Sequence, residues 1–185
     1  MDLPVVDIGF KEIEENKAAG IYPEINIDET DFYTTGLIRT TQTLEAVYGH
    51  VYHVPIENMK EINFGDWEGK DYDALNCQDE WHEWMNDSTG TFSFPGGGES
   101  ALSFSHRIEK GLDELLEYHH QKEIQQFEQG KDAVSVIFCH GGTIAATMSL
   151  WFPGEREYFF KWTPSTSRGY TVYFEDGKPT HYTEI

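Results

Sequence analysis

Residues 133–139 form an apolar run, AVSVIFC, rich in β-branched and aromatic side chains. A strand that is apolar on both faces is typical of the covered interior of a parallel sheet, so this run predicts a central strand. It leads directly into residues 140–143, HGGT, which open a predicted helix that ends near Trp151. A buried strand that passes straight into a helix favours an α/β fold.

Helical and extended patterns alternate along the rest of the chain. Apolar spacing predicts helices over residues 10–19, 37–48, 71–85 and 99–128, strands over residues 31–35 and 52–59, and a closing hairpin of residues 170–174 and 180–185. The alternation predicts an α/β three-layer sandwich, with a mostly parallel central sheet and helices on both faces. Because no linker or repeat interrupts the pattern, we expect a single domain over residues 1–185.

The chain is strongly acidic. Thirteen Lys and Arg against 33 Asp and Glu give a formal net charge of -20. This charge repels nucleic acid and anionic membrane surfaces, so we expect neither as a partner. No basic region followed by an apolar stretch opens the chain, and no segment reaches the ~18 to 20 apolar residues of a membrane span. Cys77 and Cys139 lack metal-type spacing. We therefore expect a cytoplasmic protein without a structural disulfide or zinc site.

His140 is the strongest candidate for a functional residue. It stands at the carboxyl end of a predicted buried strand, where ligands bind in open α/β sheets. The following Gly141 and Gly142 allow backbone N–H groups to approach an anion, and a helix N-terminus adds partial positive charge. A histidine that only ends a strand is the alternative, which the two glycines and the apolar run make less favourable.

Arg39 and Glu61 are the next candidates. Arg39 lies in the first turn of a predicted helix that directly follows a strand, and its fork of donors suits a phosphate. Glu61, in the segment KEINFGDWEG, lies beside apolar residues that can raise the pKa of a carboxyl and make it a general acid. Either residue alone could equally be a solvated surface side chain.

Three sequence blocks together resemble the histidine phosphatase superfamily, also called phosphoglycerate-mutase-like. The blocks are FGDWEG at residues 64–69, PGGGES at 95–100 and CHGGT at 139–143, and their order matches over essentially the whole chain. They look most like the small-metabolite phosphatase branch, the alpha-ribazole-phosphate type included. The resemblance implies that Arg39 clamps phosphate, that Glu61 protonates the leaving alcohol, and that His140 stabilises the transferring phosphoryl group.

The same resemblance implies a phosphate-binding set of Arg39, His140 and Gly141. It implies no cofactor and no metal, because histidine and arginine supply the charge stabilisation. The expected ligand is a small phosphorylated metabolite. Its identity would depend on residues 70–106, where no motif indicates one.

The chain departs from the family pattern at its start. The family opens with a strand that ends in Arg-His-Gly, whose histidine attacks phosphorus, and no Arg-His-Gly occurs in these 185 residues. The expectation is that the first strand of the family fold is missing and that the chain as given is inactive, since covalent catalysis needs a nucleophile. In the family this strand lies beside the one predicted at residues 133–139, so we expect self-association through the exposed sheet edge.

Three functions stay open at this point. We favour a phosphomonoester hydrolase of the histidine phosphatase family that lacks its nucleophilic histidine. One alternative is a non-catalytic protein that binds or senses a phosphorylated ligand. The other is a phosphotransfer reaction of the phosphoglycerate-mutase type.

Overall fold

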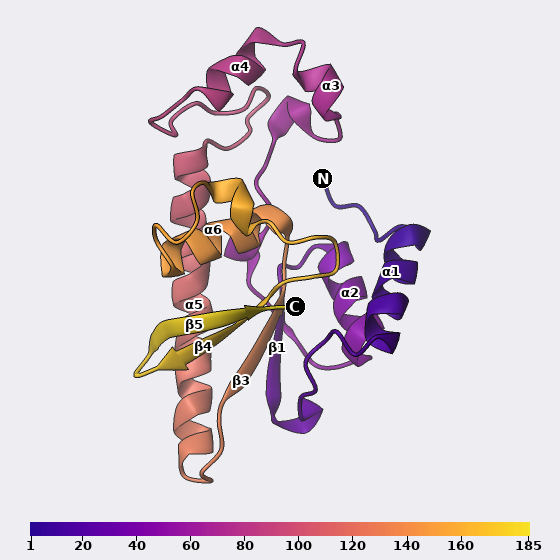
Figure 1. Ribbon diagram of the computed structural model, residues 1–185, viewed down its shortest axis with the longest axis vertical. Helices are drawn as coiled ribbons and strands as arrows, with labels where there is room; N and C mark the ends of the chain where they lie inside the picture. The colour runs from indigo at the N-terminus through magenta and orange to yellow at the C-terminus, as the bar shows by residue number, and fades with distance from the viewer.

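The computed structural model describes residues 1–185, apart from the side chain of Tyr72. A parallel sheet lies between two groups of helices, as Figure 1 shows. The strands are β1 (Thr30–Thr34), β2 (Val54–Pro55) and β3 (Val134–Phe138), and the covering helices are α1 (Asp7–Ala18), α2 (Ile38–Tyr48), α5 (Ala101–Phe127) and α6 (Gly141–Trp151). The predicted α/β three-layer architecture is confirmed.

The two faces of the sheet bury different sets of side chains. On the face covered by α5, Tyr33 belongs to a buried cluster with Ile108. On the opposite face the ring of Phe32 lies 5.5 Å from that of Tyr48 on α2, which in turn lies 6.1 Å from that of Phe138. Because successive strand residues point to opposite faces, neighbouring residues of β1 and β3 serve the two layers.

The strand order in this sheet is β2-β1-β3, and all the pairings are parallel. Among the described strands, β3 therefore lies at an edge and pairs only with β1, so its prediction as a central strand is wrong. Its side chains are partly exposed, and Val134 is 36% exposed, because no described strand covers the other side.

The closing hairpin is confirmed, but it forms a sheet of its own. Strands β4 (Tyr170–Glu175) and β5 (Lys178–Glu184) pair with each other in antiparallel fashion. Asp176 and Gly177 both have positive φ angles, of 50° and 71°. A two-residue turn of this kind matches the right-handed twist of the flanking strands.

The predicted strand over residues 52–59 is largely wrong. Only Val54–Pro55 pairs with β1, and the chain then curls into the 3-10 helix η2 (Glu57–Met59). Proline has no N–H to donate to a ladder, which favours an early end of pairing. The curl brings the backbone of residues 58–61 against α5 and α6.

The predicted helix over residues 71–85 is divided into two. α3 (Tyr72–Leu75) and α4 (Asp79–Met85) are separated by a turn in which Gln78 is extended. These short helices lie at one end of the molecule, above the amino-terminal end of α5 (Figure 1). Trp67, Leu75 and Phe94 form the buried cluster of this region.

The helix predicted over residues 99–128 is confirmed as α5. α5 begins after Ser100, whose hydroxyl accepts a hydrogen bond from the N–H of Ser103, while Ser103 Oγ accepts one from the N–H of Ser100. This reciprocal cap satisfies two of the free donors at the helix start. Within the part of the chain that the structure describes, no helix has the length and apolar character needed to cross a membrane.

Candidate active site

His140 joins the carboxyl end of β3 to the first turn of α6, where it is the N-cap residue. Its side chain is buried, with 7% of the residue exposed. Nε2 lies 2.9 Å from Thr35 Oγ1, and Nδ1 accepts a hydrogen bond of 3.2 Å from Arg39 Nε. Because Nδ1 accepts, the neutral ring carries its proton on Nε2 and donates it to Thr35.

The surroundings of His140 keep the ring neutral. Burial is the largest cause that lowers its pKa to about 3, and the positive charges of Arg39 and Arg107 act in the same direction. When a buried imidazole beside a cation is protonated, it suffers both lost hydration and like-charge repulsion. An incoming anion would offset both effects.

Arg39 reaches His140 because β1 passes into α2 through a tight turn. Gly36 in this turn has a φ angle of 79°, a conformation that glycine adopts without strain. Besides its contact with His140, Arg39 donates from Nη1 to the carbonyl oxygen of Met1 at 3.0 Å. Among the described residues, Nη2 has no hydrogen-bond partner and is available to a ligand.

Glu61 approaches the same helix start from the loop after η2. Its Oε2 accepts a hydrogen bond of 3.1 Å from the N–H of Gly142, and its Oε1 accepts one of 2.9 Å from the N–H of Ile62. Burial raises the pKa of Glu61, and these two N–H groups lower it by a smaller amount. A carboxyl with a raised pKa can hold a proton nearer neutral pH than an exposed one.

The two glycines of α6 therefore differ in what they do. Gly142 uses its N–H for Glu61, and a Cβ built there would collide with the Glu61 carboxylate. Within the described part of the chain the N–H of Gly141 has no partner, and a Cβ built there would lie 3.1 Å from Thr163 Cγ2. Of the two, Gly141 is the one whose N–H can meet an anion.

Three predicted site residues thus meet at the first turn of α6: Arg39 contacts His140, and Glu61 contacts the residue two positions further on. The arrangement combines a guanidinium, a helix N-terminus and a carboxyl with a raised pKa. Such groups can hold an anion and protonate an oxygen bonded to it. The roles assigned to Arg39, Glu61, His140 and Gly141 stay predictions.

A family model described as histidine phosphatase superfamily (branch 1) matches residues 2–183. The chain belongs to this family. No curated protein matches the chain.

Several solved structures resemble the chain over most of its length. An alpha-ribazole phosphatase from Shigella flexneri superposes with a TM-score of 0.72 at 18% identity, over 97% of this chain and 83% of the other. An Escherichia coli protein assigned to the same activity gives 0.73 at 17% identity, over 96% and 81%. A Thermus thermophilus protein gives 0.53 at 24% identity, over 82% and 72%. At these identities the likeness shows the fold alone.

Two of the sequence blocks that indicated the histidine phosphatase family pack against each other. The N–H of Asp66 donates to the carbonyl of Pro95 at 2.8 Å, and the N–H of Glu99 donates to that of Asn63 at 2.8 Å. A Cβ built at Gly65 or at Gly98 would overlap with the opposite block, so the close approach requires glycine at both positions. The sequence did not predict that these blocks are partners.

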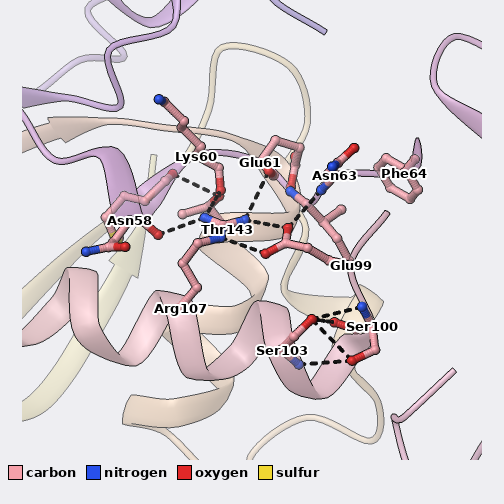
Figure 2. A network of polar contacts seen from close by, with 12 residues as sticks. Asn58, Lys60, Glu61, Asn63, Phe64, Glu99, Ser100, Ser103, Arg107 and Thr143 are labelled. Carbon is pink, nitrogen blue, oxygen red and sulfur yellow. Dashed lines mark hydrogen bonds and ion pairs between the residues drawn. The ribbon is translucent and has the colours of Figure 1, made fainter. Parts of the chain in front are cut away.

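Sequence reasoning also missed three residues next to the site. Thr35 Oγ1 accepts the hydrogen bond from His140 Nε2, and Glu99 and Arg107 form an ion pair of 2.7 Å beneath the Glu61 loop (Figure 2). Glu99 stood inside the PGGGES block without an assigned role. Its spacing of eight residues from Arg107 would have been the available signal, because residues about two turns apart lie on one side of a helix and its entry.

No group of three or more His, Cys, Asp and Glu side chains in the described structure is arranged to hold a metal ion. The expectation that the site needs neither metal nor cofactor stays a prediction.

Proposed function

We propose that Arg39, Glu61, His140 and Gly141 form the phosphate-binding and proton-donating part of a phosphomonoester hydrolase site. The site would act on a small phosphorylated metabolite. The observation that carries the proposal is the meeting of Arg39, His140 and Glu61 at the first turn of α6. Membership of the histidine phosphatase superfamily supports the phosphoryl chemistry.

Each residue then has a distinct task. Arg39 binds phosphate oxygens through its free Nη2 while its Nε keeps the hydrogen bond to His140 Nδ1, and the N–H of Gly141 adds a donor at the positive end of α6. His140 lies beside the phosphoryl group, and its Nε2–H, which Thr35 accepts in the structure, turns to donate to that group as negative charge develops. Glu61 gives its proton to the oxygen of the leaving alcohol, which its raised pKa favours.

The reaction also needs a nucleophile. In the family this is the histidine of an Arg-His-Gly strand, and these 185 residues contain no such motif. We therefore propose that a chain of these residues alone binds phosphate without forming a phosphohistidine. An added strand that ends in Arg-His-Gly should complete the site.

The small-metabolite class is supported by two solved neighbours that are alpha-ribazole phosphatases or assigned as such.

A non-catalytic role in binding a phosphorylated ligand is the second candidate. The observation that favours it is that Arg39, His140 and Gly141 are assembled within these residues, whereas an Arg-His-Gly motif does not occur among them. Both candidates predict phosphate binding, and turnover separates them.

The test compares hydrolysis of p-nitrophenyl phosphate by the 185-residue chain and by a chain extended with an Arg-His-Gly strand. We expect background rates from the first and turnover from the second. The matched control is the extended chain with Ala in place of its new histidine. Activity of the 185-residue chain that is lost on His140→Ala would contradict the missing nucleophile. An extended chain that folds, binds phosphate and stays inactive would favour the binding role.

A further inference from the structure

We propose that Arg107, fixed by its ion pair with Glu99, is the positioning residue that holds Glu61 against Gly142. The inference deepens the proposed function, because it rests on the task of Glu61 as proton donor. Figure 2 shows Arg107 on α5, beneath the loop that carries Glu61.

The guanidinium of Arg107 uses all five of its N–H groups. Nη1 donates to the carbonyls of Asn58 and Lys60 at 2.8 and 2.9 Å, and Nη2 donates to the carbonyl of Glu61 at 3.2 Å. The remaining donors, on Nε and Nη2, go to the two carboxylate oxygens of Glu99 at 2.7 Å each. A planar, fully occupied fork of this kind fixes both distance and orientation.

Glu99 continues this hydrogen-bond network on the carboxyl-terminal side of Glu61. Besides Arg107, its Oε2 accepts a hydrogen bond of 2.9 Å from the N–H of Asn63, and its own N–H donates to the Asn63 carbonyl. Residues 58–61 are thus held by the guanidinium and residue 63 by its partner carboxylate. Glu61 lies between these two anchors, so its backbone has little freedom to move.

Two further contacts fix the position of residues 58–61. Thr143 Oγ1, on α6, lies 3.2 Å from the carbonyls of Met59 and Lys60. On α5, a Cβ built at Gly111 would lie 2.8 Å from the side chain of Met59, so η2 packs directly on a bare part of the helix. Gly111 and Arg107 are four residues apart and therefore share one helix face.

The ion pair also suits the electrostatics of the site. The charge of Arg107 lowers the pKa of both Glu61 and His140, as one of the smaller causes in each case. Burial raises the pKa of Glu99, but the hydrogen bonds from Arg107 and Asn63 and the charge of Arg107 together outweigh this, so the carboxylate is charged. A charged Glu99 offsets much of the Arg107 field, so the fork can hold three carbonyls without forcing Glu61 to ionise.

This hydrogen-bond network predicts the effect of replacing the guanidinium of Arg107. A lysine at position 107 keeps the charge but offers a compact ammonium in place of the planar fork. It can satisfy only part of the five contacts, so the Glu61 loop should loosen while the electrostatic field stays similar. Arg107→Lys therefore separates the effect of the positive charge from the effect of the hydrogen bonds that position Glu61.

The experiment follows the pH titration of the Glu61 carboxyl carbon and of the Gly142 amide by NMR, without substrate. It is run on the 185-residue chain and on the extended chain, so that self-association through the free edge of β3 cannot account for the result. In the parent we expect the Gly142 amide shift to follow the raised midpoint of Glu61. In Arg107→Lys we expect the Gly142 response to be lost and the Glu61 midpoint to return toward its ordinary range.

The matched control is Lys122→Arg, a charge-preserving exchange in the ion pair with Asp31, which should leave both titrations unchanged. If Arg107→Lys gives no folded spectrum, Glu99→Gln is read in the same way, because its amide offers one acceptor oxygen where the bidentate pair with Arg107 uses two. A folded variant with a lower melting temperature but unchanged titrations would overturn the proposal and leave Arg107 a purely structural role. Failure of the proposed function would instead appear in the turnover assay and would leave these titrations unaffected.

Discussion

The carboxylate of Glu61 occupies the space that a side chain at position 142 would need. The N–H of Gly142 donates to Glu61 Oε2 at 3.1 Å, and a Cβ built on Gly142 would collide with Oε1. The φ angle of Gly142 is not positive, so its backbone conformation is open to any residue. The requirement for glycine here is one of contact with Glu61.

Gly142→Ala should therefore displace Glu61 without disturbing α6. A displacement of about 1 Å at a reacting group can cost about 10²-fold in rate, and we expect a loss of that order in the extended chain. Gly169→Ala is the matched control, because a Cβ built there meets nothing within 4 Å and its φ angle is not positive. Turnover of p-nitrophenyl phosphate measures both variants, and equal losses would contradict the special role of Gly142.

The pairing of His140 with a strand end and a helix start could be predicted because the signal is local. An apolar run followed by HGGT is contained in the neighbouring residues 133–143. Arg39 could be predicted in the same way, from its place in the first turn of α2. Their contact at 3.2 Å was only implied, since it depends on β1 and β3 being neighbours in the sheet.

The support of Glu61 could not be predicted, because it comes from contacts far apart in the chain. Arg107 reaches carbonyls 46 to 49 residues away, and Gly142 lies 81 residues from Glu61. Tertiary contacts also explain why the strand predicted over residues 52–59 is largely wrong. Pairing with β1 stops at Pro55, and η2 then forms against α5. Apolar spacing reports which face is buried, but not which partner buries it.

Glu61→Gln should abolish turnover while leaving phosphate binding nearly intact. The amide keeps the size of the side chain but has no proton to give to a leaving alcohol. General acid catalysis commonly contributes about 10²- to 10⁴-fold, and we expect a loss in that range in the extended chain. Steady-state rates and phosphate titration are measured together. An equal loss of binding and turnover would instead assign Glu61 a role in holding the ligand.

Phosphate should bind to the 185-residue chain with millimolar affinity between Arg39 and His140. The donors are Arg39 Nη2, which has no partner in the described structure, and the N–H of Gly141. NMR titration with phosphate should shift the signals of Arg39, Gly141 and His140. Signals of His50 and of Lys131, which lie away from the first turn of α6, serve as the reference. An absence of shifts at the three site residues would contradict the half-site.

The ring of His140 should stay neutral well below the pH at which an exposed histidine is protonated. Its pKa is about 3 in the folded protein and 6.5 as the ordinary value, so between these limits only the unfolded chain takes up the proton. This group therefore stabilises the fold above pH 6.5 and loses that contribution as the pH falls, by about 1.4 kcal/mol per pH unit. Denaturant unfolding at several pH values should show this slope, and His140→Gln should remove it. An identical slope in the variant would contradict the neutral ring.

The free edge of β3 sets the last expectation. Among the described strands β3 pairs only with β1, and β4 pairs only with β5, so each has one side without a strand partner. Unpaired N–H and C=O groups cost about 1 to 3 kcal/mol each when buried, against a net stability of about 5 to 15 kcal/mol for a domain. An open apolar edge is also a template for pairing with another chain.

We therefore expect the 185-residue chain to self-associate through β3 and to melt at a lower temperature than a chain extended by a strand that ends in Arg-His-Gly. The added strand should pair along β3, satisfy its outer edge and leave a monomer. The control is an extension of equal length with prolines at alternate positions, which cannot donate to the ladder and should restore neither property. Light scattering after size-exclusion chromatography and thermal unfolding measure the two effects. A monodisperse 185-residue monomer that melts with the extended chain would contradict this, because it would mean that another segment already covers β3.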